Sequence, residues 1–171
     1  MVLLSSKMVP LGTPASDFNL MGIDGAWHSL HSYAAAEVLV VVFMCNHCPY
    51  VQKIWDVLVS LEKGFPESVQ VLGINSNGGN PAYPEDSFEK MKEYALARGQ
   101  EFPYLFDEAQ VVGKAYGAEC TPDFFVYGKG RFLAYRGAFE GVQSAVEALL
   151  KGEMPVAQQI HSMGCSIKWN G

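Results

Sequence analysis

One junction constrains this chain more than any other: an apolar strand runs directly into a pair of cysteines and then into an amphipathic helix. Residues 38–44 read Val-Leu-Val-Val-Val-Phe-Met, a continuous run typical of a central strand covered on both faces. Cys45 and Cys48 follow at once, and residues 50–63 carry apolar side chains at helical spacing. A Cys-x-x-Cys pair between a strand and a helix is typical of thiol–disulfide chemistry.

The start of a helix favours an ionised sulfur. Its unpaired N–H groups and partial positive charge stabilise a thiolate, and such surroundings lower a cysteine pKa from about 8.5 to roughly 3.5–7.5. We therefore predict Cys45, at the first and exposed position, as the attacking thiolate and Cys48, one turn further on, as the inward-facing resolving thiol. His47 lies between them; it either adds positive charge that tunes the thiolate or is a solvated loop residue.

A metal site is the main rival interpretation of the cysteine pair. Zinc typically takes four ligands, from two such pairs or from one pair and spaced histidines. Here the other cysteines, Cys120 and Cys165, are solitary in the sequence. Pro49 rather than histidine follows Cys48, which excludes covalent haem on motif grounds. We expect no metal and no other cofactor.

The rest of the chain alternates strands and helices, which predicts an α/β fold with a central mixed β-sheet flanked by helices. Asp24-Gly25 favours a tight turn, so residues 18–30 are expected to form an N-terminal β-hairpin. We expect a single domain over residues 1–171, with residues 152–171 as a tail of undefined structure. Further strands are predicted at 69–75, 102–106, 124–127 and 132–136, and further helices at 86–98, 108–116 and 141–151.

The charge and hydropathy of the sequence limit which partners the protein can bind and in which cell compartment we expect it. The formal net charge is −6 without a lysine or arginine cluster, so nucleic acid and anionic membranes are poor partners. The first residues lack the apolar run of about 7–15 residues that a secretory signal needs, and no apolar stretch approaches the roughly 20 residues of a membrane helix. We expect a cytoplasmic protein, where paired cysteines are more often catalytic or metal-binding than structural.

The sequence resembles the thioredoxin-like superfamily, and within it the peroxiredoxin-like branch of alkyl hydroperoxide reductase and thiol-specific antioxidant proteins. The resemblance covers most of the chain and rests on residues 17–30, 45–49, 83–87, 118–125 and 164–169. It implies a thioredoxin-like fold and cysteine-based redox activity.

The resemblance also implies that Thr121-Pro122 is a cis-proline loop beside the active site. In that role the backbone of Thr121 would be exposed for strand-like pairing with a substrate disulfide or peptide; the alternative is an ordinary trans proline that opens a strand. Tyr50 directly follows the cysteine site, where it either lines the substrate groove or packs inside the protein.

The two solitary cysteines have two interpretations. Cys120 directly precedes the Thr121-Pro122 loop and Cys165 lies in the tail, so they could form a second exchange pair that passes electrons to the first. Such a pair requires α-carbons within roughly 7 Å of each other. Alternatively, both are buried and act as small hydrophobic side chains.

Peroxide-reducing members of this branch carry the pattern Pro-x-x-x-Thr-x-x-Cys before the reactive cysteine. Counting back from Cys45 gives Val42 and Val38 at the threonine and proline positions, and counting back from Cys48 gives Cys45 and Val41. The hydroxyl that would position peroxide is missing in both registers, which argues against peroxidase activity.

Many thioredoxins also hold a buried acid on the strand before the site, beneath the resolving cysteine. Residues 38–44 contain no ionisable group, so proton transfer must use something else, with Glu37 and water as the candidates.

The sequence thus predicts a thiol–disulfide oxidoreductase that acts on protein or small-molecule disulfides and draws electrons from a thioredoxin- or glutathione-type reductant. Two alternatives stay open: a peroxiredoxin-like thiol peroxidase that reduces hydroperoxides, and a non-enzymatic redox sensor or metal-binding module.

Overall fold

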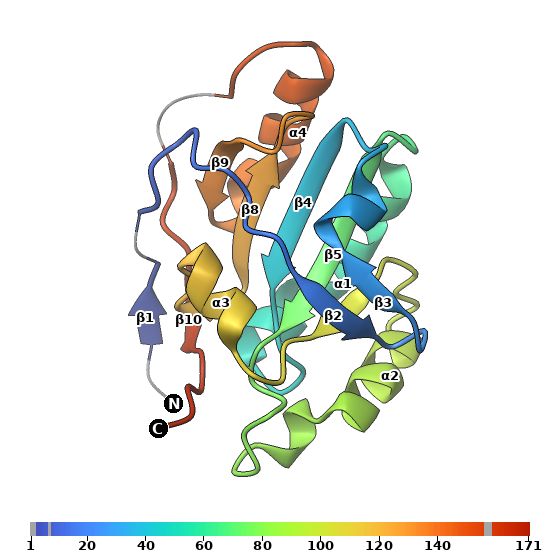
Figure 1. Cartoon of the computed structure of the whole chain (residues 1–171), viewed down its shortest axis with the longest axis vertical. Coiled ribbons are helices and arrows are strands. Elements are labelled where there is room, and N and C mark those ends of the chain that lie inside the picture. Colours follow the sequence, from blue (N-terminus) through green and yellow to red (C-terminus); the bar gives the residue numbers. More distant parts are fainter. Residues whose placement is uncertain (1–2, 7, 156–158) are drawn as a thin grey trace.

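The computed structural model describes residues 3–6, 8–155 and 159–171, and its centre is a seven-stranded mixed sheet in the order β3-β2-β6-β5-β4-β8-β9 (Figure 1). A separate three-stranded sheet has the order β1-β10-β7. The strands are β1 (Leu3–Ser5), β2 (Asn19–Gly22), β3 (Trp27–Ser29), β4 (Val38–Phe43), β5 (Val69–Asn75), β6 (Tyr104–Phe106), β7 (Cys120–Thr121), β8 (Asp123–Tyr127), β9 (Leu133–Gly137) and β10 (Met163–Ser166). The helices are α1 (Pro49–Gly64), α2 (Phe88–Ala97), α3 (Val111–Tyr116) and α4 (Val142–Leu150), with short 3₁₀ helices η1 (Leu30–Tyr33), η2 (Pro84–Asp86) and η3 (Phe139–Gly141).

The main sheet confirms the predicted α/β architecture. β4, β5 and β6 are parallel to one another, whereas β8 and β9 form an antiparallel hairpin against β4. The predicted N-terminal hairpin is β2–β3, which turns at Asp24-Gly25 and joins the sheet through β6. Gly25 has a φ of +80°, the left-handed conformation that glycine adopts without strain.

Strand β4 is buried throughout because both faces of the sheet are covered. The even-numbered residues from 38 to 44 pack with apolar side chains of α1, α2 and α4. The odd-numbered residues from 39 to 43 pack on the opposite face with α3. Side chains alternate between faces along a strand, so a continuous apolar run is what this position requires. The strand therefore ends in the middle of the molecule, and the cysteine pair begins there.

Helix boundaries follow their local caps. α2 begins after Ser87, whose hydroxyl accepts the backbone N–H of Lys90 and so caps the helix. α3 begins three residues later than the predicted Glu108. The carboxylate of Asp107 accepts the N–H groups of Val112 and Gly113, which leaves the intervening residues in a turn outside the helix.

The C-terminal tail contains a strand that no sequence pattern indicated. β10 pairs antiparallel with β7 on one side and with β1 on the other. All three strands are short. The paired strands β1 and β10 are more than a hundred residues apart in the chain. The hydrophobic periodicity of a short segment does not predict pairing between strands so far apart in the chain. Within the part of the chain that the structure describes, no helix is both long and apolar enough to cross a membrane.

Candidate functional site

The junction between β4 and α1 places Cys48, rather than Cys45, at the start of the helix. Cys48 is the N-cap residue of α1 and Pro49 is its first residue. Proline fits this position because its missing N–H has no partner in the first turn and its φ is already helical. The positive end of the helix dipole therefore acts most directly on Cys48.

Both sulfurs of the pair are inside the protein, so the predicted exposure of Cys45 is wrong. The exposed fraction is 0% for Cys45 and for Cys48. Thr121 closes the site from the neighbouring loop: its hydroxyl lies 3.5 Å from Cys45 Sγ, and its carbonyl oxygen lies 3.4 Å from Cys48 Sγ. The loop that carries His47 is fixed from the other side by Asp86.

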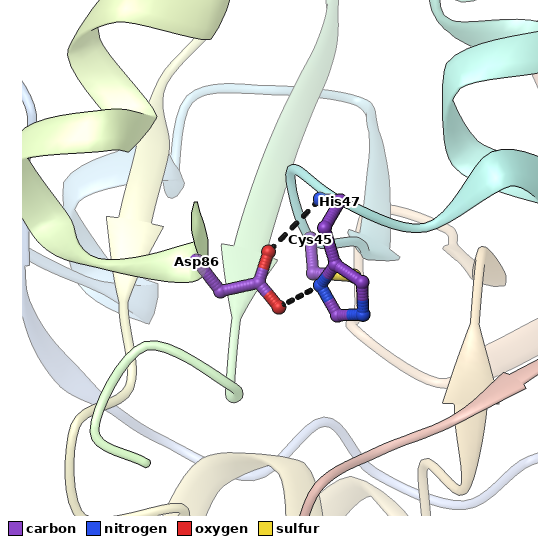
Figure 2. Close-up of side chains that lie close together, drawn as sticks. All are labelled: Cys45, His47 and Asp86. Carbon is purple, nitrogen blue, oxygen red and sulfur yellow. Dashed lines mark hydrogen bonds and ion pairs between the residues drawn. The ribbon is translucent and has the colours of Figure 1, made fainter. Parts of the chain in front are cut away.

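Asp86 is the acid that the sequence analysis missed. Its side chain is fully buried, and one carboxylate oxygen accepts the backbone N–H groups of Asn46 (2.8 Å) and His47 (3.0 Å). The other oxygen accepts the His47 Nδ1–H and the side-chain amide of Asn77 (3.2 Å). Figure 2 shows the carboxylate facing His47, with Cys45 directly behind the ring. One carboxylate thus holds the loop between the two cysteines.

Glu37, the acid considered from the sequence, lies elsewhere. It is exposed and immediately precedes β4, so the full length of that strand separates it from Cys45. Asp86 comes instead from η2, just before α2. Nothing in the local sequence connects Asp86 with the cysteine loop, because its partners at residues 46 and 47 are about 40 positions away.

The electrostatics of the pair separate the two sulfurs. The pKa of Cys48 is lowered to about 5, chiefly because the Cys45 thiol donates a hydrogen bond to it and secondarily because Cys165 does so, which together outweigh burial. The pKa of Cys45 is raised well above its usual range by burial, by its donation to Cys48 and by the negative charge of Asp86. The geometry and the charges therefore favour Cys48 as the sulfur that ionises.

His47 is bound to Asp86 rather than being a solvated loop residue. The hydrogen bond to that carboxylate raises the pKa of His47, against the effect of partial burial. The ring also stacks on Tyr83, with centroids 5.5 Å apart. A protonated His47 would lie beside both cysteines, as the tuning hypothesis requires, with much of its charge balanced by Asp86.

The side chains of Cys45, His47 and Asp86 are the group best suited to bind a metal ion in the part of the chain that the structure describes. Cys45 Sγ, His47 Nδ1 and a carboxylate oxygen of Asp86 all lie within 4.8 Å of one another. However, His47 Nδ1 already donates to the carboxylate, and both carboxylate oxygens accept two N–H groups each. A metal would have to break this network, and zinc would need a fourth ligand.

The Thr121–Pro122 peptide bond is cis, as the resemblance implies. The predicted exposure of the Thr121 backbone is wrong, because Thr121 is only 2% exposed and pairs with Cys165 of β10. The chain's own tail therefore occupies the edge that was expected to receive a substrate strand. The fit is close: a Cβ on Gly164 would lie 1.9 Å from the Thr121 carbonyl oxygen, so this position requires glycine.

A second pair between Cys120 and Cys165, one of the two interpretations left open by the sequence, is not compatible with the strand register. Cys165 is opposite Thr121 and Cys120 is opposite Ser166. Adjacent positions along a strand face opposite sides, so the two cysteine side chains point away from each other. Cys165 Sγ instead lies 2.8 Å from Cys48 Sγ. Cys120 is fully buried, and burial raises its pKa, which fits the alternative of a small hydrophobic side chain.

Tyr50 lies beside a surface groove next to the cis-proline loop. It is 42% exposed, so it does not simply pack in the interior. The groove has a volume of about 400 Å³, and Tyr50 lines it together with Pro122, Phe139, Ile160 and Met163. Of the three residues proposed from the sequence to contact substrate, Tyr50 and Pro122 line this groove, whereas Thr121 does not.

We predict that the Cys48 thiolate forms with a midpoint near pH 5, the pKa of about 5 that the surrounding donors produce. Replacing Cys45 with alanine removes the largest of these donors, so the midpoint should rise towards the ordinary value of about 8.5. Cys45→Ser keeps a hydroxyl donor and is the matched control with a smaller rise. Ultraviolet absorbance of the thiolate during a pH titration measures all three proteins. An unchanged midpoint in Cys45→Ala would contradict the assignment.

The sheet order, the cis-proline loop and the cysteine pair at the start of α1 define a thioredoxin-like protein. The fold agrees with the thioredoxin domain of a thiol-disulfide oxidoreductase from Bacteroides vulgatus, with a TM-score of 0.65 at 13% identity over 77% of this chain and 90% of that one. The chain belongs to the AhpC/TSA family, whose model matches residues 11–139. This membership confirms the resemblance found in the sequence.

Two solved structures are similar over nearly the full chain. An uncharacterized conserved protein from Geobacillus kaustophilus is 39% identical, with a TM-score of 0.95 over 99% of this chain and 97% of that one. A hypothetical protein from Sinorhizobium meliloti 1021 is 37% identical, with a TM-score of 0.94 over 98% of each chain. Comparison with curated proteins gave no match. Membership of the AhpC/TSA family supports a thiol-based redox function.

Proposed function

We propose that the protein is a thiol–disulfide oxidoreductase in which Cys48 attacks a disulfide of a protein or small molecule and Cys45 is its resolving partner. The observation that carries the proposal is the position of Cys48 at the N-cap of α1 with the Cys45 thiol as its donor. This reverses the two roles expected from the sequence, because the helix begins one residue after the second cysteine and not after the first.

The reaction proceeds in two exchanges. The Cys48 thiolate attacks one sulfur of the substrate disulfide, the substrate S–S bond breaks, and the leaving thiolate takes a proton from solvent. Cys45 then loses its proton and attacks Cys48 Sγ, which releases the second substrate thiol and forms the Cys45–Cys48 disulfide. Asp86, within 4.8 Å of Cys45 Sγ, is placed to receive that proton directly or through water. Two electrons pass to the substrate, and a thioredoxin- or glutathione-type thiol restores the dithiol.

Substrate recognition is proposed for the groove at Tyr50 and Pro122. Its lining is largely apolar, with Phe139, Ile160 and Met163 beside these two residues. Tyr50 lies two residues after Cys48 in the chain and Pro122 belongs to the cis-proline loop, so this apolar groove suits a partner that presents its disulfide on hydrophobic side chains. His47, on the Asp86 side of the pair, would stabilise the thiolate electrostatically.

A thiol peroxidase is the second candidate, and two observations favour it. The chain belongs to the AhpC/TSA family, which includes peroxide-reducing proteins, and Cys48 lies at a helix start, where a thiolate is stabilised. A hydroxyl also lies beside the cysteine pair, because that of Thr121 is 3.5 Å from Cys45 Sγ, whereas Cys48 Sγ faces the Thr121 carbonyl oxygen at 3.4 Å. In this reaction Cys48 takes one peroxide oxygen to become a sulfenic acid and releases an alcohol or water. A second thiol then condenses with it to a disulfide and water.

Parallel assays separate the candidates. For an oxidoreductase we expect insulin reduction by dithiothreitol to run well above the uncatalysed rate, and consumption of hydrogen peroxide and cumene hydroperoxide to stay near the rate of free thiol. Cys120→Ser serves as the control, because it makes the same substitution at a cysteine that takes no part in the proposed exchange. Fast peroxide consumption without insulin reduction would transfer the assignment to the peroxidase. Stoichiometric zinc or iron in the purified protein, with both assays at background, would indicate a metal-binding module.

A further inference from the structure

The strand beside the cis-proline loop carries a third thiol into the site. β10 lies antiparallel to β7 with Cys165 opposite Thr121, and β1 pairs with its other edge. Cys165 is 1% exposed, and its Sγ lies 2.8 Å from the Cys48 Sγ. The C-terminal segment therefore occupies the Thr121 backbone edge that was expected from the sequence to receive a substrate, and it places a sulfur where a substrate sulfur would meet Cys48.

We propose that Cys165 is a redox partner of Cys48, presented by the chain's own C-terminal strand, and that it closes a Cys48–Cys165 disulfide during exchange. The inference rests on the proposed attack by Cys48 and adds a second route for its resolution. A disulfide has an S–S length of about 2.05 Å, so the two sulfurs need to approach by less than 1 Å from their separation of 2.8 Å.

The surroundings of the two candidate resolving thiols differ. Cys45 faces the negative charge of Asp86, which opposes its ionisation. Burial, its hydrogen bond to Cys48 and the charge of Cys48 raise the pKa of Cys165 to about 12, while the positive charge of Lys168 and the backbone N–H of Tyr50 in the first turn of α1 act to lower it. Once Cys48 is held in a mixed disulfide, its negative charge is gone. The remaining charges then favour ionisation of Cys165 over that of Cys45.

The proposed step balances without a further reactant. A substrate disulfide first forms a mixed disulfide with Cys48 and releases one thiol. Cys165 then gives up its proton and attacks Cys48 Sγ, the bond between Cys48 and the substrate sulfur breaks, and the second substrate thiol leaves with a proton. The substrate gains two electrons, and the Cys48–Cys165 pair loses them.

Tryptic peptide mapping tests this directly because the sequence separates the two possible disulfides. Cleavage after Lys7 and Lys53 leaves Cys45 and Cys48 together in peptide 8–53, whereas cleavage after Lys151 and Lys168 leaves Cys165 in peptide 152–168. The reduced full-length protein is treated with one equivalent of oxidised glutathione, quenched in acid, alkylated and digested without reductant. A link between the two peptides reports Cys48–Cys165, and an internal bond in peptide 8–53 reports Cys45–Cys48.

We expect the wild type and Cys45→Ser to yield the linked peptides, and Cys165→Ser to lose them completely. Gly164→Ala should also reduce the link, because the added methyl group pushes β10 away from the Thr121 carbonyl. Cys45→Ser/Cys165→Ser should accumulate glutathione on Cys48. Wild type that forms only the bond internal to peptide 8–53 would overturn the role of Cys165 while leaving the proposed function intact. Absence of any disulfide and of any glutathione adduct would instead overturn the proposed function.

Discussion

Replacing Cys48 with serine is expected to lower the rate of disulfide reduction by a factor on the order of 10³ or more, as losses of a catalytic nucleophile do in other enzymes. The serine hydroxyl stays protonated at neutral pH, whereas the Cys48 thiol, with a pKa of about 5, is almost fully ionised there. In a single-turnover reaction with a chromogenic aromatic disulfide, the first equivalent of coloured thiol measures the attack step, and the second equivalent reports resolution.

Cys45→Ser is the informative comparison for this experiment. If Cys48 attacks, Cys45→Ser should still release the first thiol at a rate within a small factor of the wild type, since serine preserves a donor to the thiolate. The opposite result, with attack lost in Cys45→Ser and retained in Cys48→Ser, would support the roles first expected from the sequence. Cys120→Ser should react like the wild type, because Cys120 lies on the opposite face of the strand pair from Cys165.

Replacing Asp86 with alanine is expected to lower the free energy of unfolding by about 3–5 kcal/mol, the range found when one partner of a buried charged network is removed. The carboxylate is fully buried and serves the backbone N–H groups of Asn46 and His47 as well as two side chains. Donors left without an acceptor in the interior cost about 1–3 kcal/mol each. Urea denaturation of both proteins, followed by circular dichroism, gives the difference.

An exposed carboxylate provides the control for this substitution. Asp56 on α1 has 74% of its side chain exposed and forms an ion pair with Arg98 at 3.2 Å. Removing such a surface pair typically costs no more than about 1 kcal/mol, so Asp56→Ala should unfold close to the wild type. A loss in Asp86→Ala as small as that in Asp56→Ala would show that the cysteine loop is held by other contacts.

The parts of the fold that were predictable from sequence depend on local patterns. The apolar run at 38–43, the amphipathic spacing of α1, the Asp24-Gly25 turn and the Ser87 cap each act within a few residues. They were enough to place the cysteine pair at a strand–helix junction. The sequence also indicates where the helix begins. Proline favours the first helical position, so Pro49 predicts that Cys48 is the N-cap, although Cys45 was expected to be the attacking thiolate.

The parts that were not predictable depend on contacts between distant residues. Asp86 reaches the cysteine loop from 39 and 40 positions away, and Cys165 reaches Cys48 across 117 positions. No local sequence pattern links Asp86 or Cys165 to the cysteine pair. The burial of Cys45 has the same origin, because the groups that enclose it come from the loops at 86 and 121. The local sequence thus places the cysteine pair, and the tertiary fold brings the residues that surround it.

The pairing of β1 with β10 has a practical consequence for anyone who prepares this protein. Leu3 is opposite Cys165 and Leu4 is opposite Gly164, so the first strand lies directly against the segment that reaches the reactive sulfur. Affinity tags, fusion partners or trimmed ends at either terminus would therefore perturb the chemistry and not merely the solubility of the product. Recombinant material whose tag has been removed, compared with tagged material, is the appropriate starting point for any measurement of its reduction potential.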